Sequence, residues 1–474
     1  MTLPHIPILR YGVEYDSLST VEVKDHRTGE PLAIVSQANA GIIRRDAMKI
    51  DDAWNKLRSM SIKDLMAITR EAGEKFMNES LPLGNRGHTQ SPDEYVETLS
   101  KTSGLPHTLC RRNMAKVYEV FEKMPTILGS LMRGLSFEAI DEGKGEQAGS
   151  PVCFFPTAKS LGCVLPSNSP GVNSLWMPAI PLKTPLFLKP GREEPWTPYR
   201  IMQAFLAAGC PKEAFGYYPT DHEGAESILT RSGKALLFGD ANTTARYKSN
   251  PNINIHGPGY SKVLVGEDMI DNWRDFIDVL VGSVADNGGR SCINASGIIV
   301  PRHAAEIADE LAKRLAAIKP AVANDPEAKL SSFANPKMAE YMDDAIDSDL
   351  EGAEDVTARY REGDRKVNLD GSIFLQPTLV QCPDIEHPLA KREFLFPYAS
   401  ITEVPQAEMV DKIGPTLVVS AITNDPAFIG ELMVAEHVDR LNVGTMPTSK
   451  VHWDQPHEGN LFEFLYRRRA LQYA

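Results

Sequence analysis

Residues 261–301 read "SKVLVGEDMIDNWRDFIDVLVGSVADNGGRSCINASGIIVP". The apolar runs at its two ends, 261–265 and 293–300, have the length and composition of buried strands. The segment between them, 269–289, carries apolar residues at helical spacing. We therefore predict a strand, a helix and a second strand in succession, which is typical of a parallel sheet covered by helices.

The same alternation occurs on both sides of this stretch. Earlier in the chain, "LGCVLPSN", "TPLFLKPG" and "KALLFGD" resemble buried strands, and "PWTPYRIMQAFLAAG" resembles a helix that Gly209 ends. Later, "HAAEIADELAKRLAAI" predicts a helix, and further strand-like runs continue to about residue 420. The fold class expected from these patterns is α/β, with two doubly wound domains and a small element of short strands near 136–160.

Composition excludes several classes of protein. The 474 residues carry a formal net charge of −13 and lack a basic stripe, so we expect no nucleic-acid partner. The basic cluster "YRRRALQ" at 466–472 is interpreted as a solvated helix end or a subunit contact. The six cysteines form no CxxC pair, so neither a metal site nor a disulfide framework is expected. No secretory signal or membrane span is visible, and we expect a cytoplasmic protein.

Cys292 ends the stretch "NGGRSC" at 287–292. A thiolate there would be a nucleophile, and the two glycines would let another molecule approach the backbone. A small buried side chain entering a strand is the alternative. The local sequence leaves both interpretations open.

Polar side chains follow three of the predicted strands, where ligands of open α/β sheets bind. Asn168 is a candidate donor to an oxyanion, although a turn-forming asparagine is commoner. Lys189 could hold a ribose hydroxyl or a phosphate, or be a solvated lysine at a strand end. The stretch "FGDANTTARY" at 238–247 could receive a phosphate on backbone N–H groups.

Six stretches in this order resemble the aldehyde dehydrogenase superfamily over essentially the whole chain. They are "DHRTGEPL" (25–32), "PSNSP" (166–170), "FLKPG" (187–191), "NGGRSC" (287–292), "GSIFLQPTLV" (371–380) and "REFLFP" (392–397). The resemblance implies two Rossmann-like domains and a β-hairpin near 136–160 that serves oligomerisation. Residues 1–255 would bind NAD or NADP, 256–445 would carry the nucleophile, and 446–474 would form a tail that packs back, near a subunit interface.

The resemblance also assigns residue roles. Cys292 matches the nucleophile that attacks an aldehyde, and Asn168 matches the side chain that polarises its oxygen. Lys189 matches a contact to the adenosine ribose, and Glu393 a contact to the nicotinamide ribose. The other residues that it assigns to the cofactor site are Pro166, Ser167, Gly239 and Phe396. In this family collapse of the tetrahedral alkoxide leaves a thioester on the cysteine.

One departure concerns release of the acyl group. Hydrolytic members use a glutamate just before the strand that here reads "VLVGED", and His256 or Gly257 takes its place. The stretch "GPGYSKVLV" resembles that of acylating members, which use coenzyme A. A thiol needs less base assistance than water, so we expect coenzyme A to accept or donate the acyl group. His256 is an alternative general base for a hydrolytic enzyme.

Three further expectations remain open. Arg192 stands where NAD-preferring members often carry a glutamate, which favours NADP, unless Glu193 and Glu194 balance it as a surface arginine. A homodimer or homotetramer is expected, although the usual long tail strand is absent from the sequence. The leading function is interconversion of an aldehyde and an acyl thioester; the alternatives are oxidation to a carboxylic acid and a non-catalytic family member.

Overall fold

The computed structural model describes residues 2–472, and these residues divide into two compact units. The first unit comprises residues 2–102, 110–257 and 452–472, and the second comprises 103–109 and 258–451. The first unit therefore takes in the C-terminal tail. The roles predicted for residues 1–255, 256–445 and 446–474 stay predictions.

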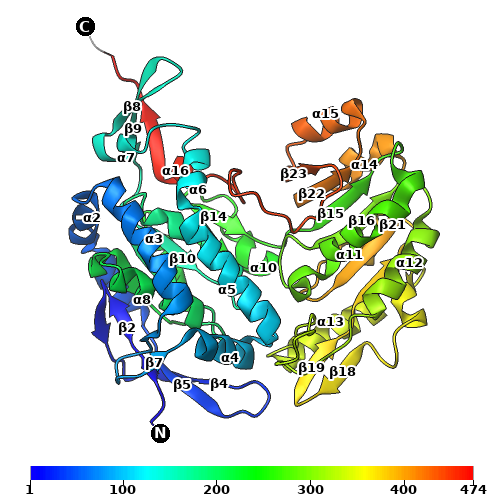
Figure 1. Ribbon diagram of the computed structural model, residues 1–474, viewed down its shortest axis with the longest axis horizontal. Coiled ribbons are helices and arrows are strands. Elements are labelled where there is room, and N and C mark those ends of the chain that lie inside the picture. Colours follow the sequence, from blue (N-terminus) through cyan, green and yellow to red (C-terminus); the bar gives the residue numbers. More distant parts are fainter. Residues whose placement is uncertain (1, 473–474) are drawn as a thin grey trace. The chain divides into compact units, whose positions relative to one another are not determined.

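The first unit is built on a seven-stranded sheet (Figure 1). In spatial order its strands are β14 (Ile253–His256), β13 (Lys234–Phe238), β10 (Leu161–Val164), β11 (Leu186–Lys189), β12 (Phe215–Tyr217), β2 (Ile8–Arg10) and β3 (Val13–Tyr15). The first five strands run parallel, and β2 and β3 are antiparallel additions at one edge. The central strands are buried along their length, as expected for a sheet covered on both faces.

The helices of the first unit lie beside this sheet or beside the smaller sheets described below. They are α1 (Ala40–Ala47), α2 (Ile50–Arg58), α3 (Ile62–Asn78), α4 (Pro92–Ser103), α5 (His107–Glu122), α6 (Met124–Leu131), α7 (Glu138–Glu142), α8 (Trp196–Ala207), α9 (His222–Arg231), α10 (Ala241–Ala245) and α16 (Leu461–Leu465). A reciprocal capping pair begins α4: Ser91 Oγ accepts from the Glu94 N–H, and the Glu94 carboxylate accepts from the Ser91 N–H.

Smaller sheets complete the first unit. β4 (Thr20–Lys24) and β5 (Pro31–Ser36) form a hairpin, with β1 (His5–Ile6) beside β5; β6 (Leu81–Pro82) pairs with β7 (Thr89–Gln90). The expected hairpin near 136–160 consists of β8 (Lys144–Gln147) and β9 (Ser150–Pro156).

The tail differs from one expectation. Residues 466–469 form β24 (Tyr466–Arg469), which pairs antiparallel with β9 and runs beside it in Figure 1. The interpretation of these residues as a helix end was wrong. Their side chains are mostly exposed, and the Arg469 guanidinium lies over the Phe155 ring, 4.2 Å from its centroid.

The second unit contains the opening stretch of sequence. Its seven-stranded sheet has the order β17 (Glu354–Asp355), β20 (Thr378–Gln381), β21 (Tyr398–Glu403), β16 (Ala295–Val300), β15 (Ser261–Val265), β22 (Thr416–Ile422) and β23 (Val438–Val443). All neighbours run parallel except β17 and β20. A hairpin of β18 (Lys366–Leu369) and β19 (Ser372–Leu375) lies outside it. Its helices are α11 (Ile277–Ala285), α12 (Ala304–Ala316), α13 (Pro336–Ser348), α14 (Gln406–Lys412) and α15 (Pro426–Val434).

The helix predicted over 269–289 is only partly formed. Residues 270–276 make 3-10 turns, with Asn272 outside helical geometry, and α11 covers only residues 277–285. After α11 the backbone enters the left-handed region at Asn287, Gly288 and Gly289. A glycine pair allows this turn at little steric cost, so the helix ends before the cysteine.

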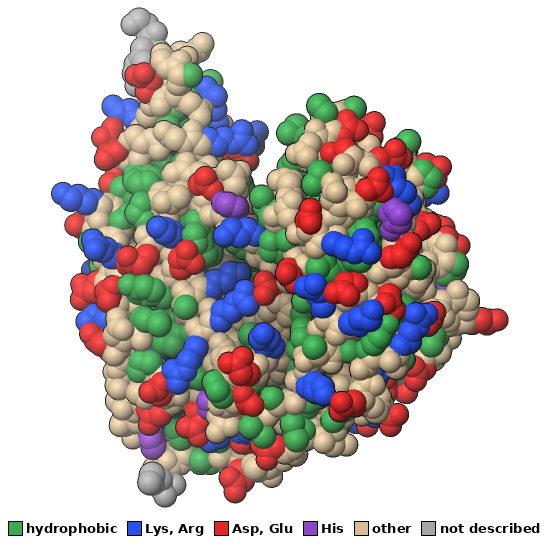
Figure 2. All heavy atoms as spheres, turned by 45° about the vertical axis from the view of Figure 1, so that its right-hand side comes forward, with side chains coloured by type: hydrophobic (Ala, Val, Ile, Leu, Met, Phe, Trp, Pro, Cys, Tyr) green, Lys and Arg blue, Asp and Glu red, His purple; other side chains and the backbone are tan. Residues whose placement is uncertain are grey.

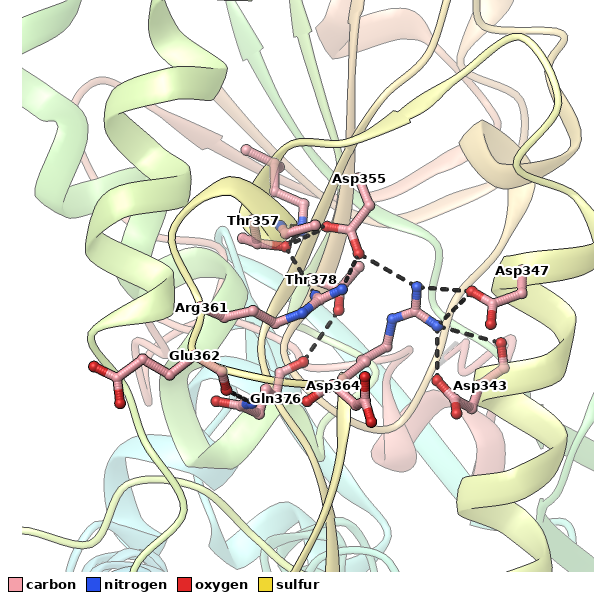
Figure 3. A network of polar contacts seen from close by, with 12 residues as sticks. Asp343, Asp347, Asp355, Thr357, Arg361, Glu362, Asp364, Gln376 and Thr378 are labelled. Carbon is pink, nitrogen blue, oxygen red and sulfur yellow. Dashed lines mark hydrogen bonds and ion pairs between the residues drawn. The ribbon is translucent and has the colours of Figure 1, made fainter.

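A buried ion-pair network holds the segment after α13 (Figure 3). Asp355 accepts from Arg361 at 2.6 Å and from Arg365 at 3.3 Å, and Arg365 also pairs with Asp343 at 2.7 Å. The pKa of Arg365 is raised, because these carboxylates outweigh the burial that acts to lower it.

Charge is mixed on the surface. On the face shown in Figure 2, acidic and basic side chains are interspersed. Within residues 2–472, no helix has the length and apolar character that crossing a bilayer requires.

Candidate active site

Most of the residues predicted for the first unit lie near one edge of its sheet. Lys189 ends β11, Gly239 follows β13, and His256 ends β14. Because parallel strands end at the same edge, these positions meet there. The loop after β10, which carries Pro166, Ser167 and Asn168, belongs to this edge as well.

Hydrogen bonds fix the Asn168 loop on both sides of that residue. Ser167 Oγ accepts from the Glu193 N–H at 3.3 Å. Asn173 donates to the Pro170 carbonyl at 2.9 Å and accepts from the Trp176 indole N–H at 2.9 Å. Trp176 is fully buried, so it packs the core here. The Asn168 side chain is thus carried by a loop with little freedom to move.

Gly191 is needed where this loop meets the strand end of β11. A Cβ at Gly191 would lie 2.4 Å from Ser167 Oγ and 2.5 Å from the Pro166 carbonyl oxygen. Only a glycine allows this approach without displacing the neighbouring backbone. Gly191 therefore brings Ser167 against the residues that follow Lys189.

A cavity of about 550 Å³ opens at this edge within the first unit. Its apolar lining includes Val164, Leu237 and Phe238, and its cationic lining includes Lys189 and Arg192. Burial is the main cause that lowers the pKa of Lys189, and the nearby Glu193 opposes it. A lining of apolar and cationic side chains is compatible with the adenosine half of a dinucleotide, whose ring needs apolar contact and whose phosphates need positive charge.

Arg246 also lines this cavity, and the sequence argument did not single it out. It lies within the quoted stretch at 238–247, where the hydroxyl residues drew the attention. The helix start in that stretch presents a carboxylate: Asp240 Oδ1 accepts from the Thr243 N–H at 2.7 Å, which lowers the pKa of Asp240.

Arg192 is exposed, whereas one of its two acidic neighbours, Glu194, is buried. Glu194 is 3% exposed and accepts from the Thr197 N–H at 2.8 Å, at the start of α8. The backbone N–H of Glu193 binds Ser167 Oγ. The picture of a surface arginine beside two surface acids was therefore wrong for Glu194.

His256 is held in a buried pocket of the first unit. Its ring stacks on Phe238 with centroids 4.5 Å apart and 14° between the planes. Nδ1 is hydrogen-bonded to a carboxylate oxygen of Glu458. Both side chains are buried, with 5% and 7% of their surface exposed. No local pattern marked Glu458, because it lies 202 positions after His256 in the chain.

In the second unit, Cys292 lies between the left-handed turn and β16. Its carbonyl oxygen accepts from Ser261 Oγ at 2.8 Å. The backbone of Gly259 passes so close that a Cβ there would lie 2.0 Å from the same oxygen. Cys292 is partly exposed.

Side chains around Cys292 hold its loop. Ser291 accepts from Asn287 Nδ2 at 3.2 Å, and the Ser291 N–H donates to Asn294 Oδ1 at 3.0 Å. Arg290 is buried: its guanidinium donates to the Ser332 carbonyl and lies over the Phe333 ring. Burial lowers the pKa of Arg290 to about 10. The visible contribution of Arg290 is to anchor the loop.

Glu393 contacts the same segment as the Cys292 carbonyl. Its carboxylate accepts from the backbone N–H groups of Gly259, at 3.2 Å, and of Tyr260. Phe396 is 2% exposed and packs with Phe394 and Tyr398 in a hydrophobic core cluster. The cofactor roles of Glu393 and Phe396 stay predictions.

Comparison with known proteins identifies the family of this chain. The Aldehyde dehydrogenase family matches residues 13–414, most of the chain. The chain belongs to the aldehyde dehydrogenase family. Membership makes NAD(P)-dependent aldehyde dehydrogenase its enzyme class.

Individual aldehyde dehydrogenases are distant in sequence. A Staphylococcus haemolyticus protein named "Putative aldehyde dehydrogenase SH0913" is 21% identical over 402 residues, covering 82% of this chain and 79% of its own. The crystal structure of aldehyde dehydrogenase 21 from Physcomitrella patens, complexed with the reaction product succinate, matches with a TM-score of 0.78 and 18% identity over 99% and 98% of the two chains. An indole-3-acetaldehyde dehydrogenase complexed with NAD+ gives a TM-score of 0.80 and 16% identity over 99% and 96%. These structures show the aldehyde dehydrogenase fold for this chain.

Proposed function

We propose that the chain oxidises an aldehyde with NAD(P) through a thioester on Cys292, and that coenzyme A takes the acyl group. The observation that carries this proposal is a histidine in place of the glutamate that activates water in hydrolytic members. A thiol ionises far more readily than water, so it needs a weaker base to attack a thioester.

The chain's own residues supply the remaining chemistry. The Cys292 thiolate adds to the carbonyl carbon, and Asn168 donates to the oxygen that becomes an alkoxide. A bound nicotinamide dinucleotide supplies the hydride acceptor. Lys189 and the residues of the cavity would hold its adenosine half, and Glu393 its nicotinamide ribose. The thiol of coenzyme A then attacks the thioester, and Cys292 leaves as a thiolate.

Hydrolysis is the second candidate, and the His256–Glu458 contact favours it. A histidine whose ring is positioned by a buried carboxylate could take a proton from an attacking water. The acyl acceptor in that case would be water, and the product a carboxylic acid.

NADP is the cofactor that we propose over NAD. Arg192 and Arg246 both line the cavity that would receive the adenosine half. A guanidinium can bind a 2′-phosphate through two parallel hydrogen bonds, which the 2′-hydroxyl of NAD cannot match.

A panel assay tests these proposals. The protein is incubated with aldehydes of varied length and polarity and with NAD+ or NADP+, with and without coenzyme A, and the reduced cofactor is followed. Turnover that depends on coenzyme A supports the first function, and equal turnover without it supports hydrolysis. The absence of any turnover, together with no thiol-specific labelling of Cys292, would instead support a non-catalytic protein.

We also propose a cytoplasmic homodimer or homotetramer. All six cysteines are free thiols, as is usual in a reducing compartment such as the cytoplasm. The three-stranded sheet of β8, β9 and β24 has β8 and β24 at its two edges, each of which could pair with another subunit. Light scattering of the purified protein gives the oligomeric state, and a monomeric mass would refute this part of the proposal.

A further inference from the structure

Lys262 is a buried lysine in the sheet of the second unit. It lies on β15, whose residues are all buried, and it is 6% exposed. Lys183 is buried to the same degree, but it pairs with the Asp141 carboxylate at 2.5 Å. Among the described residues Lys262 has no such partner: its Nζ donates to the Tyr260 carbonyl at 2.7 Å and to Thr416 Oγ1 at 3.1 Å. A buried cation without a paired carboxylate costs free energy, so its retention indicates a role.

The segment that Lys262 holds lies against Cys292. A Cβ at Gly259 would be 2.0 Å from the Cys292 carbonyl oxygen and 3.1 Å from Cys292 Cβ. Ser261 Oγ donates to the same carbonyl oxygen at 2.8 Å. Residues 259–261 therefore form one wall of the Cys292 loop, and Lys262 binds the middle of this segment through the Tyr260 carbonyl.

Glu393 binds the same segment at its N–H groups. The carboxylate accepts from the backbone N–H of Gly259 at 3.2 Å and from that of Tyr260. Tyr260 has a φ of 46°, in the left-handed region that residues other than glycine rarely adopt, so its backbone is strained. A carboxylate at the N–H groups and the Lys262 ammonium at a carbonyl oxygen hold the segment in this conformation.

The two charges have opposite effects on a nearby thiol. A carboxylate raises the pKa of a thiol, and a cation lowers it. Burial lowers the pKa of Lys262 to about 8, and attraction to Glu393 opposes this shift. Lys262 is therefore mostly charged at neutral pH and loses its charge as the pH rises through about 8. The other titratable groups beside Glu393 are Tyr260, whose pKa is raised by burial and by Glu393, and Arg392, which acts to lower the pKa of Tyr260.

We propose that Lys262 is a positioning residue for the thiol of Cys292. Its ammonium holds the strained segment 259–261 in place and offsets the negative charge of Glu393, so that Cys292 ionises more readily. The inference rests on Cys292 being the nucleophile of the proposed function. It concerns how the thiol is prepared for attack, and it is independent of whether coenzyme A or water removes the acyl group.

Alkylation by iodoacetamide measures the ionisation of Cys292 without an aldehyde or a cofactor. The thiolate sulfur bonds to the carbon that carries iodine, and iodide leaves. Mass spectrometry of the peptide that contains residue 292 gives the rate at each pH. The variant is Lys262→Met, which keeps a side chain of similar length and has no charge to bury. The matched control is Lys183→Met, the same change at a buried lysine of the first unit.

The midpoint of the alkylation profile should rise by about one pH unit in Lys262→Met. This is the shift expected when one charge is removed at a distance on the order of 10 Å and an effective dielectric constant of about 20. Lys183→Met should keep the midpoint of the parent protein. An unchanged midpoint in Lys262→Met, or the same shift in both variants, would overturn the proposal.

Hydrogen exchange of the parent protein provides a test that needs no variant. Protection of the Gly259 and Tyr260 N–H groups, corrected for the intrinsic effect of pH on exchange, should fall by about 10-fold between about pH 7 and about pH 9. The reason is that Lys262 loses its proton in this range, and a neutral amine makes a weaker hydrogen bond than an ammonium. The Ile298 N–H on β16 should keep its protection. Constant protection at Gly259 and Tyr260 would refute the role of Lys262.

The two measurements also separate this inference from the proposed function. Failure of iodoacetamide to label Cys292 at any pH would contradict the assignment of the nucleophile, and with it the proposed function. Hydrogen exchange would still show whether Lys262 holds the segment 259–261, because that measurement does not depend on the reactivity of the thiol.

Discussion

The Cys292 loop and the end of β14 hold a reactive side chain in different ways. Part of the loop's order comes from its neighbours in sequence: a left-handed turn of Asn287 and two glycines, and bonds among Asn287, Ser291 and Asn294. His256 instead depends on Glu458, which comes 202 positions later. The first arrangement can be identified from a short motif, and the second appears only when the chain has folded.

The largest expected effect is the loss of aldehyde turnover when the Cys292 thiol is removed. Cys292→Ala should lower aldehyde turnover by at least about 1,000-fold, as expected when a nucleophile is removed. Binding of NADP+ should be retained, because the cavity that would hold its adenosine half lies in the other unit. Stopped-flow absorbance measures the first turnover, and calorimetry measures cofactor binding. Turnover retained in Cys292→Ala would refute the nucleophile assignment.

The turn beside Cys292 gives the next effect. Gly289 has a φ of 68°, and a Cβ there would lie 2.2 Å from the backbone carbonyl carbon of Phe396. Gly289→Ala should lower the free energy of unfolding by about 3 kcal/mol or more, because strain and a backbone clash combine. Chemical denaturation followed by fluorescence measures this change.

Gly363→Ala is the matched control for that experiment. Gly363 has a similar φ of 77°, but a Cβ there would have nothing within 4 Å. We expect a loss of about 1 kcal/mol, from the left-handed conformation alone. Equal losses in the two variants would mean that close packing around the Cys292 turn does not matter.

The first unit contains a second buried glutamate, Glu194, which is hydrogen-bonded to Thr197, whereas Glu458 contacts a histidine. Burial raises the pKa of Glu194 to about 8, although hydrogen bonds from Thr197 act to lower it. The unfolded chain loses this proton near pH 4.5, whereas the folded chain keeps it to about pH 8, so this carboxyl group reduces stability as the pH rises through that range.

Glu194→Gln should therefore gain stability relative to the parent protein between about pH 5 and about pH 8. The gain should be on the order of a few kcal/mol and then level off. Urea unfolding at both pH values measures it. A difference that does not change with pH would show that Glu194 is ionised in the folded protein.

The smallest expected effect concerns the cofactor cavity. Arg192→Ala and Arg246→Ala should each raise the KM for NADP+ by about 10-fold and leave that for NAD+ nearly unchanged, because only NADP+ carries a 2′-phosphate. Initial rates with each cofactor measure this. Arg231→Ala is the control, since the exposed Arg231 does not line the cavity. Equal changes for both cofactors would contradict a 2′-phosphate site.

Much of the fold could be predicted because its elements depend on residues that are close together in the sequence. Apolar strands such as 186–189 and 261–265, and caps such as Ser91 with Glu94, depend on residues a few positions apart. The tail could not be predicted in the same way. The strand at 466–469 has mostly exposed side chains, so its sequence shows no alternation of apolar and polar residues. Backbone pairing with β9, which is distant in sequence, forms this strand.

The candidate site shows the same division. Lys189, Gly239 and Cys292 lie at strand ends or turns that sequence patterns mark. Glu458 carries no such mark, because nothing in the "HEGN" stretch indicates a partner on β14. The sequence shows an arginine at position 290 beside the cysteine, but it does not show what that arginine contacts. Its guanidinium binds the Ser332 carbonyl, and this contact depends on how the chain packs.

The tail's place in the first unit has a consequence for biosynthesis. A ribosome makes the chain from its N-terminus, so Cys292 and its strands emerge well before Glu458. A nascent chain that lacks the tail would leave His256 without its carboxylate partner and β9 without β24 as its neighbour. These contacts of the first unit can therefore form only late in synthesis, after the second unit has been made.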